Sequence, residues 1–244
     1  MKNRIIHMLV TVLMVCILHN CGVGPVGDTG GASETIAIMV TDTVLSGRAT
    51  RISADSVGIA NTDVIVSAYA LDYLPFMTRS ANNFTISSAA DVQGEFRCDL
   101  RGAGYYNVYV KDTHTGKSLF IDSIPVSQGS RDTIYDTLSY GGSMRGTVYF
   151  VDSSRADTSG AFNYYVFITG SPFVTRTDPL GTFFLDTLPE ARYTIKTLSS
   201  ASLDSLVNSF DILQNMINRI PGEAVSIQEG EALEGILIYS VGYK

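Results

Sequence analysis

The sequence is poor in residues that support catalysis, because its 244 residues hold three histidines, three cysteines and no tryptophan. His7 and His19 lie in the first 20 residues, and we expect that segment to be removed, which leaves His114 in a polar turn. A zinc site with several histidines, and a nucleophile paired with a second histidine, are therefore excluded. Sequence motifs for phosphate loops, dinucleotide binding and the nucleophile elbow of hydrolases are also missing.

Basic residues are scarce as well. The chain has 17 Lys and Arg against 24 Asp and Glu, a net charge of −7. Removal of Lys2 and Arg4 with the leader leaves 15 basic against 24 acidic groups, a net charge of −9. A surface this acidic repels phosphate backbones, so we expect no nucleic-acid partner.

The N-terminus has the layout of an export signal. A short basic region is followed by an apolar run over residues 5–18, which is shorter than the roughly 20 residues that a membrane span needs. Residues 18–22 (LHNCG) resemble the bacterial lipobox, whose cysteine is acylated and becomes the mature N-terminus. Leu18 and Cys21 fit that pattern, whereas His19 and Asn20 replace its usual small residues. Ordinary signal-peptidase cleavage is the competing interpretation, and whether this atypical lipobox is processed stays open.

We therefore predict a lipoprotein signal peptide over residues 1–20, and lipidation at Cys21 followed by a Gly-rich tether over residues 21–35. Gly22 rather than Asp after the cysteine implies, by the resemblance to such lipoproteins, an exported protein held at the outer membrane, either periplasmic or surface-exposed. Cys98 has no partner for an intrachain disulfide once Cys16 is removed and Cys21 is acylated. Its alternation with charged neighbours predicts a buried structural thiol.

After residue 36 the sequence reads as short strands, and it contains an internal repeat. Gly47 matches Gly146, and the hairpin motif over residues 90–96 matches the one over residues 177–183. The spacing places 12 extra residues of the first repeat in 71–83 and 14 extra residues of the second in 199–220. Residues 204–219 are either a helix or a strand with a loop.

The order of these motifs, which ends with Leu188-Pro189 and Tyr193, resembles the carboxypeptidase regulatory-like domain. This family has a small antiparallel β-sandwich of transthyretin-like topology and no peptidase machinery. We predict an all-β fold of two tandem antiparallel β-sandwich domains over residues 36–140 and 141–244, after the signal peptide and the tether. Motifs of this kind support a fold rather than a function.

Aromatic residues near the strand ends are the candidate ligand-binding residues. Such rings stack on sugars or anchor a protein partner, although core packing is the competing interpretation. The candidates are Tyr69, Tyr73, Phe76, Tyr164 and Phe173. Acidic clusters lack the spacing of a calcium loop, so no metal site and no cofactor are predicted.

The sequence thus predicts a non-catalytic, lipid-anchored cell-envelope protein that serves as a binding or spacer unit at the outer membrane. Its partners would be the membrane, through the lipid anchor, and a glycan or an envelope protein. A carbohydrate-binding surface lipoprotein, suggested by the carbohydrate-binding-like fold group, is the alternative. A secreted hydrolase with an unrecognised carboxylate site comes third. The ligand and the oligomeric state are not predicted.

Overall fold

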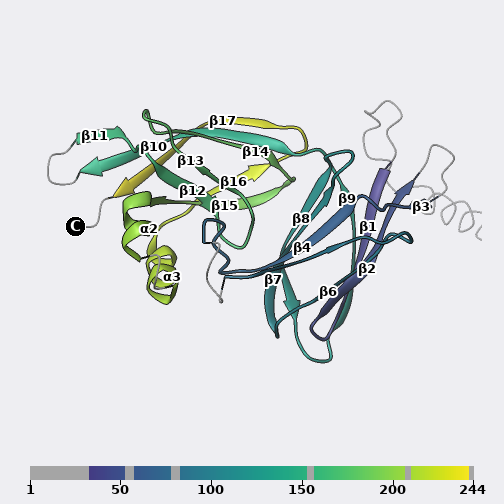
Figure 1. Ribbon diagram of the computed structural model, residues 1–244. Coiled ribbons are helices and arrows are strands. Elements are labelled where there is room, and N and C mark those ends of the chain that lie inside the picture. The colour runs from purple at the N-terminus through teal and green to yellow at the C-terminus, as the bar shows by residue number, and fades with distance from the viewer. Residues whose placement is uncertain (1–32, 53–57, 78–82, 153–156, 207–209, 242–244) are drawn as a thin grey trace, which may run out of the picture. The chain divides into compact units, whose positions relative to one another are not determined.

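The computed structural model describes residues 33–52, 58–77, 83–152, 157–206 and 210–241 (Figure 1). Residues Ser33–Lys244 form one compact unit. Strands β1–β17 dominate its described part and two helices accompany them, so the predicted all-β, sandwich-type fold is confirmed. Lipidation at Cys21 falls outside the described residues.

Two sheets are built from the first half of this unit. The first contains β1 (Ser33–Thr41), β2 (Val44–Ile52), β3 (Gly58–Ala60), β6 (Glu95–Asp99) and β9 (Arg131–Leu138). The second contains β4 (Val64–Ala70), β5 (Thr85–Ala89), β7 (Gly104–Asp112) and β8 (Ser118–Val126). Alternate residues of both sheets enter one buried apolar cluster, as in a sandwich.

The second half repeats this arrangement. One sheet, called sheet C below, contains β10 (Gly142–Asp152), β11 (Asp157–Gly160), β14 (Thr182–Leu188) and β17 (Ala232–Val241). The other, sheet D, contains β12 (Tyr164–Ile168), β13 (Val174–Arg176), β15 (Ala191–Ser199) and β16 (Glu223–Ile227). No strand is shared between the halves among the described residues, but the whole forms one compact unit, so the boundary at 140/141 between two domains stays a prediction.

Of residues 204–219, the described stretches 204–206 and 210–219 are helical, as one of the two sequence interpretations expected. Helix α2 spans Ser200–Leu206 and helix α3 spans Phe210–Arg219. Leu213 and Ile217 of α3 are buried, four residues apart on one helix face. Asp211 in the first turn and Arg219 in the last turn both suit the helix dipole.

The repeated hairpin turns form as their sequences predict. Gly94 has φ +77° and Gly181 has φ +81°, a region that favours glycine. The Asp91 carboxylate accepts hydrogen bonds from the backbone N–H groups of Gln93 and Glu95 at 2.8 and 2.9 Å. The carboxylate of Asp178 does the same for Leu180 and Thr182. Each aspartate therefore holds the turn that its glycine permits.

The position of β1 is the main difference between the two repeats. In the second half, β17 pairs directly with β10 in parallel. In the first half, β1 lies between the corresponding strands β2 and β9 and is antiparallel to both. Its residues Ile36, Ile38 and Val40 are buried in the core, so β1 is an added strand that belongs to the first sandwich.

Substitution of Gly47 tests how closely β1 packs against β2. A side chain there would collide with the carbonyl oxygen of Ala37 and lie 2.8 Å from the ring of Phe96. We expect Gly47→Ala to lower the free energy of unfolding by about 1–3 kcal/mol, because the strands or the ring must move apart. Urea denaturation measures this, with Gly58→Ala as the control since its Cβ meets nothing within 4 Å. Equal stability of the two variants would contradict the prediction.

Candidate functional site

The two insertions expected from the repeat spacing pack against each other. The loop over residues 71–77 supplies Leu74 and Met77, both buried, to a cluster that also contains residues of sheet D and both helices. We call this the junction cluster; its buried members are Leu74, Met77, Phe167, Leu198, Leu203, Leu213 and Ile217. Figure 1 shows α2 and α3 beside sheet D, on the side opposite to sheet C. The outer face of sheet D is therefore covered by the insertions of both repeats.

Polar contacts also hold the halves together. The backbone N–H of Gly170 donates to the carbonyl oxygen of Tyr73 at 2.8 Å. The buried side chain of Asn107 donates through Nδ2 to the Gly170 carbonyl at 2.9 Å, and its Oδ1 accepts from the N–H of Ser123 at 2.9 Å. Both ends of this amide are thereby satisfied, as a buried polar group requires. From the sequence alone, Asn107 is only a polar residue within an apolar strand.

Helix α3 is fixed to sheet D by a charge as well. Lys196 of β15 donates through Nζ to the carbonyl oxygen of Ile217 at 2.9 Å. This carbonyl belongs to the last turn of the helix, where a cation is favoured. Burial lowers the pKa of Lys196.

The five aromatic residues proposed as ligand contacts lie mostly in packed positions. Phe76 is 4.9 Å from the Tyr165 ring and 4.8 Å from the Phe167 ring, between ring centres. Phe173 is 9% exposed and packs on three rings, those of Tyr109, Phe120 and Tyr193. Phe173 is buried and Phe76 is partly buried, and both join the two halves.

The tyrosines of that set are less uniform. Tyr69 is 6% exposed and meets the partly buried Tyr73 edge-on, with ring centres 4.9 Å apart. Burial raises the pKa of both phenols. Tyr164 is partly buried against the core of the second half. The structure thus brings Tyr73, Phe76 and Phe173 to the contact between the halves, and ligand binding by any of the five stays a prediction.

A small crevice opens at the same contact. Its volume is about 220 Å³, and both halves line it, with Asn107, Phe120 and Asp122 from the first and Arg192 and Tyr193 from the second. The ring of Tyr193 is buried, its hydroxyl donates to the Pro189 carbonyl at 2.7 Å, and burial raises its pKa. Asp122 and Arg192 are exposed, so they are the charges that a molecule in this crevice would meet.

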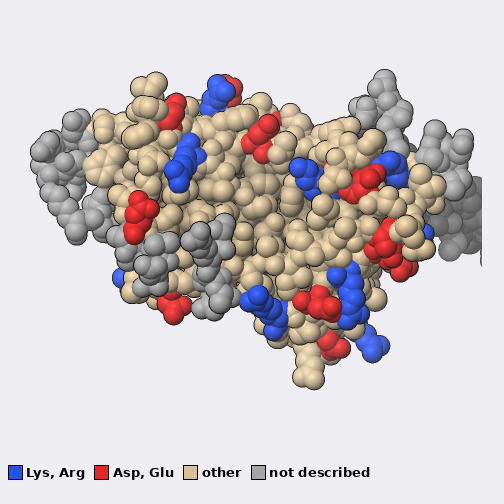
Figure 2. Space-filling view, viewed as in Figure 1, with Lys and Arg blue, Asp and Glu red and all other residues tan. Residues whose placement is uncertain are grey.

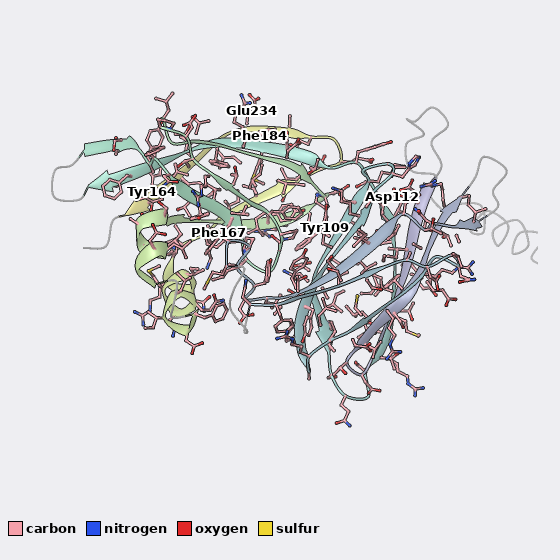
Figure 3. The ribbon with its side chains drawn as sticks, in the orientation of Figure 1. Tyr109, Asp112, Tyr164, Phe167, Phe184 and Glu234 are labelled. Atoms are coloured by element: carbon pink, nitrogen blue, oxygen red, sulfur yellow. The ribbon has the colours of Figure 1, made fainter. Side chains whose placement is uncertain are left out.

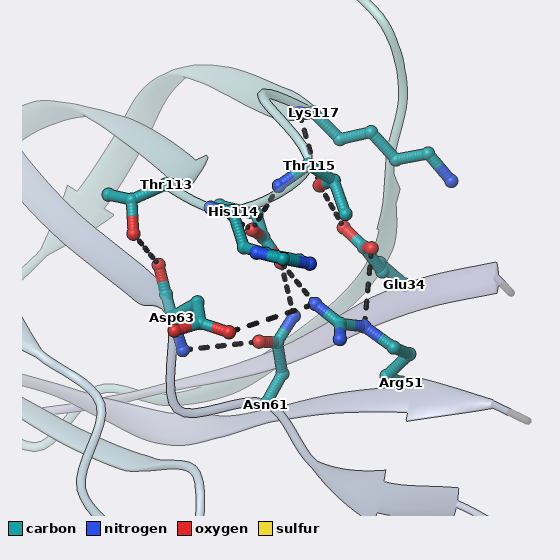
Figure 4. A network of polar contacts seen from close by, with 9 residues as sticks. Glu34, Arg51, Asn61, Asp63, Thr113, His114, Thr115 and Lys117 are labelled. Carbon is teal, nitrogen blue, oxygen red and sulfur yellow. Dashed lines mark hydrogen bonds and ion pairs between the residues drawn. The ribbon is translucent and has the colours of Figure 1, made fainter.

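A second group of polar residues closes one end of the first sandwich (Figure 4). Asp112 is fully buried and accepts hydrogen bonds from Asn61 Nδ2 at 2.7 Å and from Arg51 at 3.0 Å. The backbone N–H groups of His114 and Thr115 donate to its other oxygen at 2.8 Å. Burial by itself raises the pKa of Asp112, but these four donors outweigh burial and lower it to about 2.

Glu34 is the second buried carboxyl of this group. It lies 3.4 Å from the Arg51 guanidinium and accepts from the hydroxyl of Thr115 at 3.0 Å. Burial, and then the charge of Asp112, raise the pKa of Glu34. Arg51 therefore connects two buried carboxyls, and sequence analysis missed this group because its members are up to 81 residues apart.

His114 and Cys98, which the sequence singles out for a possible catalytic or metal-binding role, are not arranged for one. The His114 side chain is exposed, and its contact with Asp112 runs through the backbone. Cys98 is 1% exposed, and burial followed by the charge of Asp99 raises the pKa of its thiol to about 11, so the predicted buried thiol is confirmed. Within the described ranges, no group of three or more His, Cys, Asp or Glu is placed to hold a metal ion. No helix of those ranges is long and apolar enough to cross a membrane.

No family model and no curated protein matches the chain. Among solved structures, the minor pilin GBS52 of Streptococcus agalactiae is similar with a TM-score of 0.33 and 11% identity, over 78% of this chain and 87% of that chain. The major pilin subunit BcpA of Bacillus cereus gives a TM-score of 0.23 and 8% identity, over 85% of this chain and 59% of that one. A Ca²⁺-stabilised adhesin that helps an Antarctic bacterium bind ice gives a TM-score of 0.19 and 15% identity, over 85% of this chain and 50% of that one. All three TM-scores are below 0.5, so the likenesses carry no argument about function, and the resemblance to the carboxypeptidase regulatory-like domain stays a prediction.

Proposed function

We propose that this chain is a non-catalytic, lipid-anchored protein of the cell envelope, held at the outer membrane by Cys21. Its folded part acts as a spacer or binding unit that carries its contact surfaces away from the membrane. The leader and the lipobox-like residues 18–22 support the anchor, and the Gly-rich segment that follows supports the tether.

The junction cluster is the observation that carries the spacer role. Tandem modules connected by a linker alone move relative to each other by default, because few contacts cross between them. Here Leu74 and Met77 of one half are buried among residues of the other, and Gly170 bonds to Tyr73 and Asn107. An extension built in this way keeps a fixed internal geometry, as a spacer requires.

The state of the polar groups supports a non-catalytic role. A general base needs a free lone pair that faces the substrate. The oxygens of Asp112 are engaged by four donors, and both oxygens of Glu34 face Arg51 or Thr115. These buried carboxyls therefore stabilise the fold rather than hold a reacting molecule.

Cys21→Ser tests the anchor. We expect the full-length variant, made in an envelope-bearing bacterial host, to lose incorporation of labelled palmitate and to move from the membrane pellet to the supernatant. Only acylation holds the chain to the membrane in this proposal, and two or three acyl chains suffice for stable anchoring.

Cys16→Ser is the matched control, since Cys16 lies five residues before Cys21, within the leader. It should leave the label and the membrane fraction unchanged. Retention of label and of membrane binding by Cys21→Ser would overturn the anchor.

A further inference from the structure

The outer face of sheet C carries a strip of exposed aromatic and apolar side chains. Phe184 is 46% exposed, Leu237 50% and Tyr239 61%, while their chain neighbours Phe183 and Ile238 point into the core. In Figure 3 Phe184 lies on the side of the second half away from Phe167. The helices and the loop of the first repeat cover sheet D, and they leave this face of sheet C open.

The strip is ordered by strand pairing. Arg145 of β10 pairs with Phe184 of β14, and its guanidinium carbon lies 5.4 Å from the centre of that ring. Two residues further along β10, Thr147 pairs with Thr182 on one side and with Leu237 on the other. Residues paired across strands share a face, so these side chains form one continuous surface.

The far end of the strip is a pair of tyrosines. Tyr149 pairs with Tyr239 in the parallel ladder of β10 and β17, and their ring centres are 5.8 Å apart with 24° between the planes. The two rings stack on each other, and of this tyrosine pair Tyr239 is 61% exposed while Tyr149 is half-buried. Tyr149 lies four positions after Arg145 on β10, so the tyrosine pair lies about 13 Å along this strand from the Arg145–Phe184 pair.

We propose that this aromatic strip binds an extended, uncharged polysaccharide chain. The C–H faces of sugar rings carry partial positive charge and stack on the negative faces of aromatic rings. Their hydroxyl groups need hydrogen-bonding partners between the stacking positions, and the half-exposed Thr147 and Thr182 supply hydroxyls at that place. Two aromatic positions with polar groups between them suit a chain of sugars rather than a single one.

Charge selects this occupant over polyanions. The protein has a net charge of −7, and Arg145, the basic residue of the strip, already contacts the Phe184 ring. Nucleic acids and acidic polysaccharides would be repelled, whereas a neutral chain is not. Figure 2 shows Lys and Arg interspersed with Asp and Glu over the face in view.

The size of the strip argues against a protein partner. A standard protein interface uses about 20–30 residues on each side. The strip offers three exposed large apolar or aromatic side chains, Phe184, Leu237 and Tyr239, beside the half-buried Tyr149, with Thr147 and Thr182 between Phe184 and the tyrosine pair. This inference goes beyond the proposed function and does not depend on the lipid anchor, so loss of acylation leaves the binding intact.

The absence of tryptophan provides a direct test. In the full chain purified in detergent, Tyr239→Trp places a single indole in the exposed position of the tyrosine pair. We expect its emission to shift and saturate on titration with neutral soluble oligosaccharides of cellulose, chitin or mannan, because a sugar ring covers the indole. The same protein should show no shift with alginate.

Tyr149→Ala and Tyr239→Ala, measured by sedimentation with insoluble cellulose, chitin and mannan, should each weaken binding at least about tenfold. Tyr239→Phe keeps the ring and should retain binding. Tyr135→Ala is the matched control, since Tyr135 is 78% exposed on β9. Thermal unfolding verifies that each variant is folded. The Tyr239→Trp titration still tests binding if an alanine variant does not fold.

Three results would overturn the proposal. The first is no saturable shift and no sedimentation with any neutral polysaccharide. The second is binding that Tyr149→Ala and Tyr239→Ala leave unchanged. The third is a change of oligomeric state on Tyr239→Ala without any sugar binding, which would identify the strip as a contact between copies of the chain.

Discussion

Asp112→Ala is expected to lower the free energy of unfolding by about 3–5 kcal/mol, the cost of removing one partner from a buried ion pair. The carboxylate is fully buried and accepts from Arg51, Asn61 and two backbone N–H groups. Alanine would remove the acceptor of the Asn61 amide and of the two backbone N–H groups, and it would leave Arg51 with Glu34 and the more distant Asp63. Urea denaturation of the purified chain measures the loss.

Asp63→Ala is the matched control because Asp63 faces the same arginine. Its carboxylate is 46% exposed and 4.0 Å from Arg51, so we expect a loss of at most about 1 kcal/mol. An equal loss of unfolding free energy for the two variants would show that burial of Asp112 does not determine how much it stabilises the fold.

The same residue gives a pH dependence. The folded-state pKa of Asp112 is about 2, below its usual value of 3.8, so its stabilising effect is present above pH 4 and is lost as the pH falls through 2. Glu34 has the opposite effect on stability. Its pKa is raised in the folded state, so its protonation at falling pH favours the folded state. We expect the wild-type chain to lose stability between pH 4 and 2, and Asp112→Ala to lose less over that interval.

Phe167→Ala should lower the free energy of unfolding by about 3–5 kcal/mol. Its ring is fully buried and meets Phe76 edge-on at 4.8 Å, in the cluster where the insertions of the two repeats pack. The cavity would open among residues of a loop, a sheet and two helices. Urea denaturation again provides the measurement.

Phe162→Ala removes the same ring from a position that is 63% exposed, and it should change stability by less than about 0.5 kcal/mol. A loss below about 1 kcal/mol for Phe167→Ala would mean that the helices and the loop close the cavity. The junction would then be a loose contact, and the spacer role would lose its main support.

Much of the fold could be predicted from the sequence because its signals are local. Alternation of apolar and polar residues marks the strands, and Asp-x-x-Gly marks the hairpins that Gly94 and Gly181 complete. The spacing between repeated glycines located both insertions. The buried state of Cys98 followed from the same alternation.

The contacts between distant elements could not be predicted in this way. The packing of Phe76 and Phe173 depends on which insertion lies against which sheet, and no local pattern carries that information. Asp112 and Glu34 look like ordinary strand carboxylates until Arg51 is placed between them. The aromatic strip was missed for a related reason, since Tyr149 and Tyr239 meet only through a parallel pairing across 90 residues of chain.

The placement of β1 determines how the protein responds to force. A load that enters the fold at Ser33 acts on a strand paired along its length with β2 on one side and β9 on the other. An edge strand can be peeled away one hydrogen bond at a time, but a central strand pulled along its axis must shear both ladders together. Under the anchoring that we propose at Cys21, the end of the fold nearest the anchor is thus its mechanically resistant end.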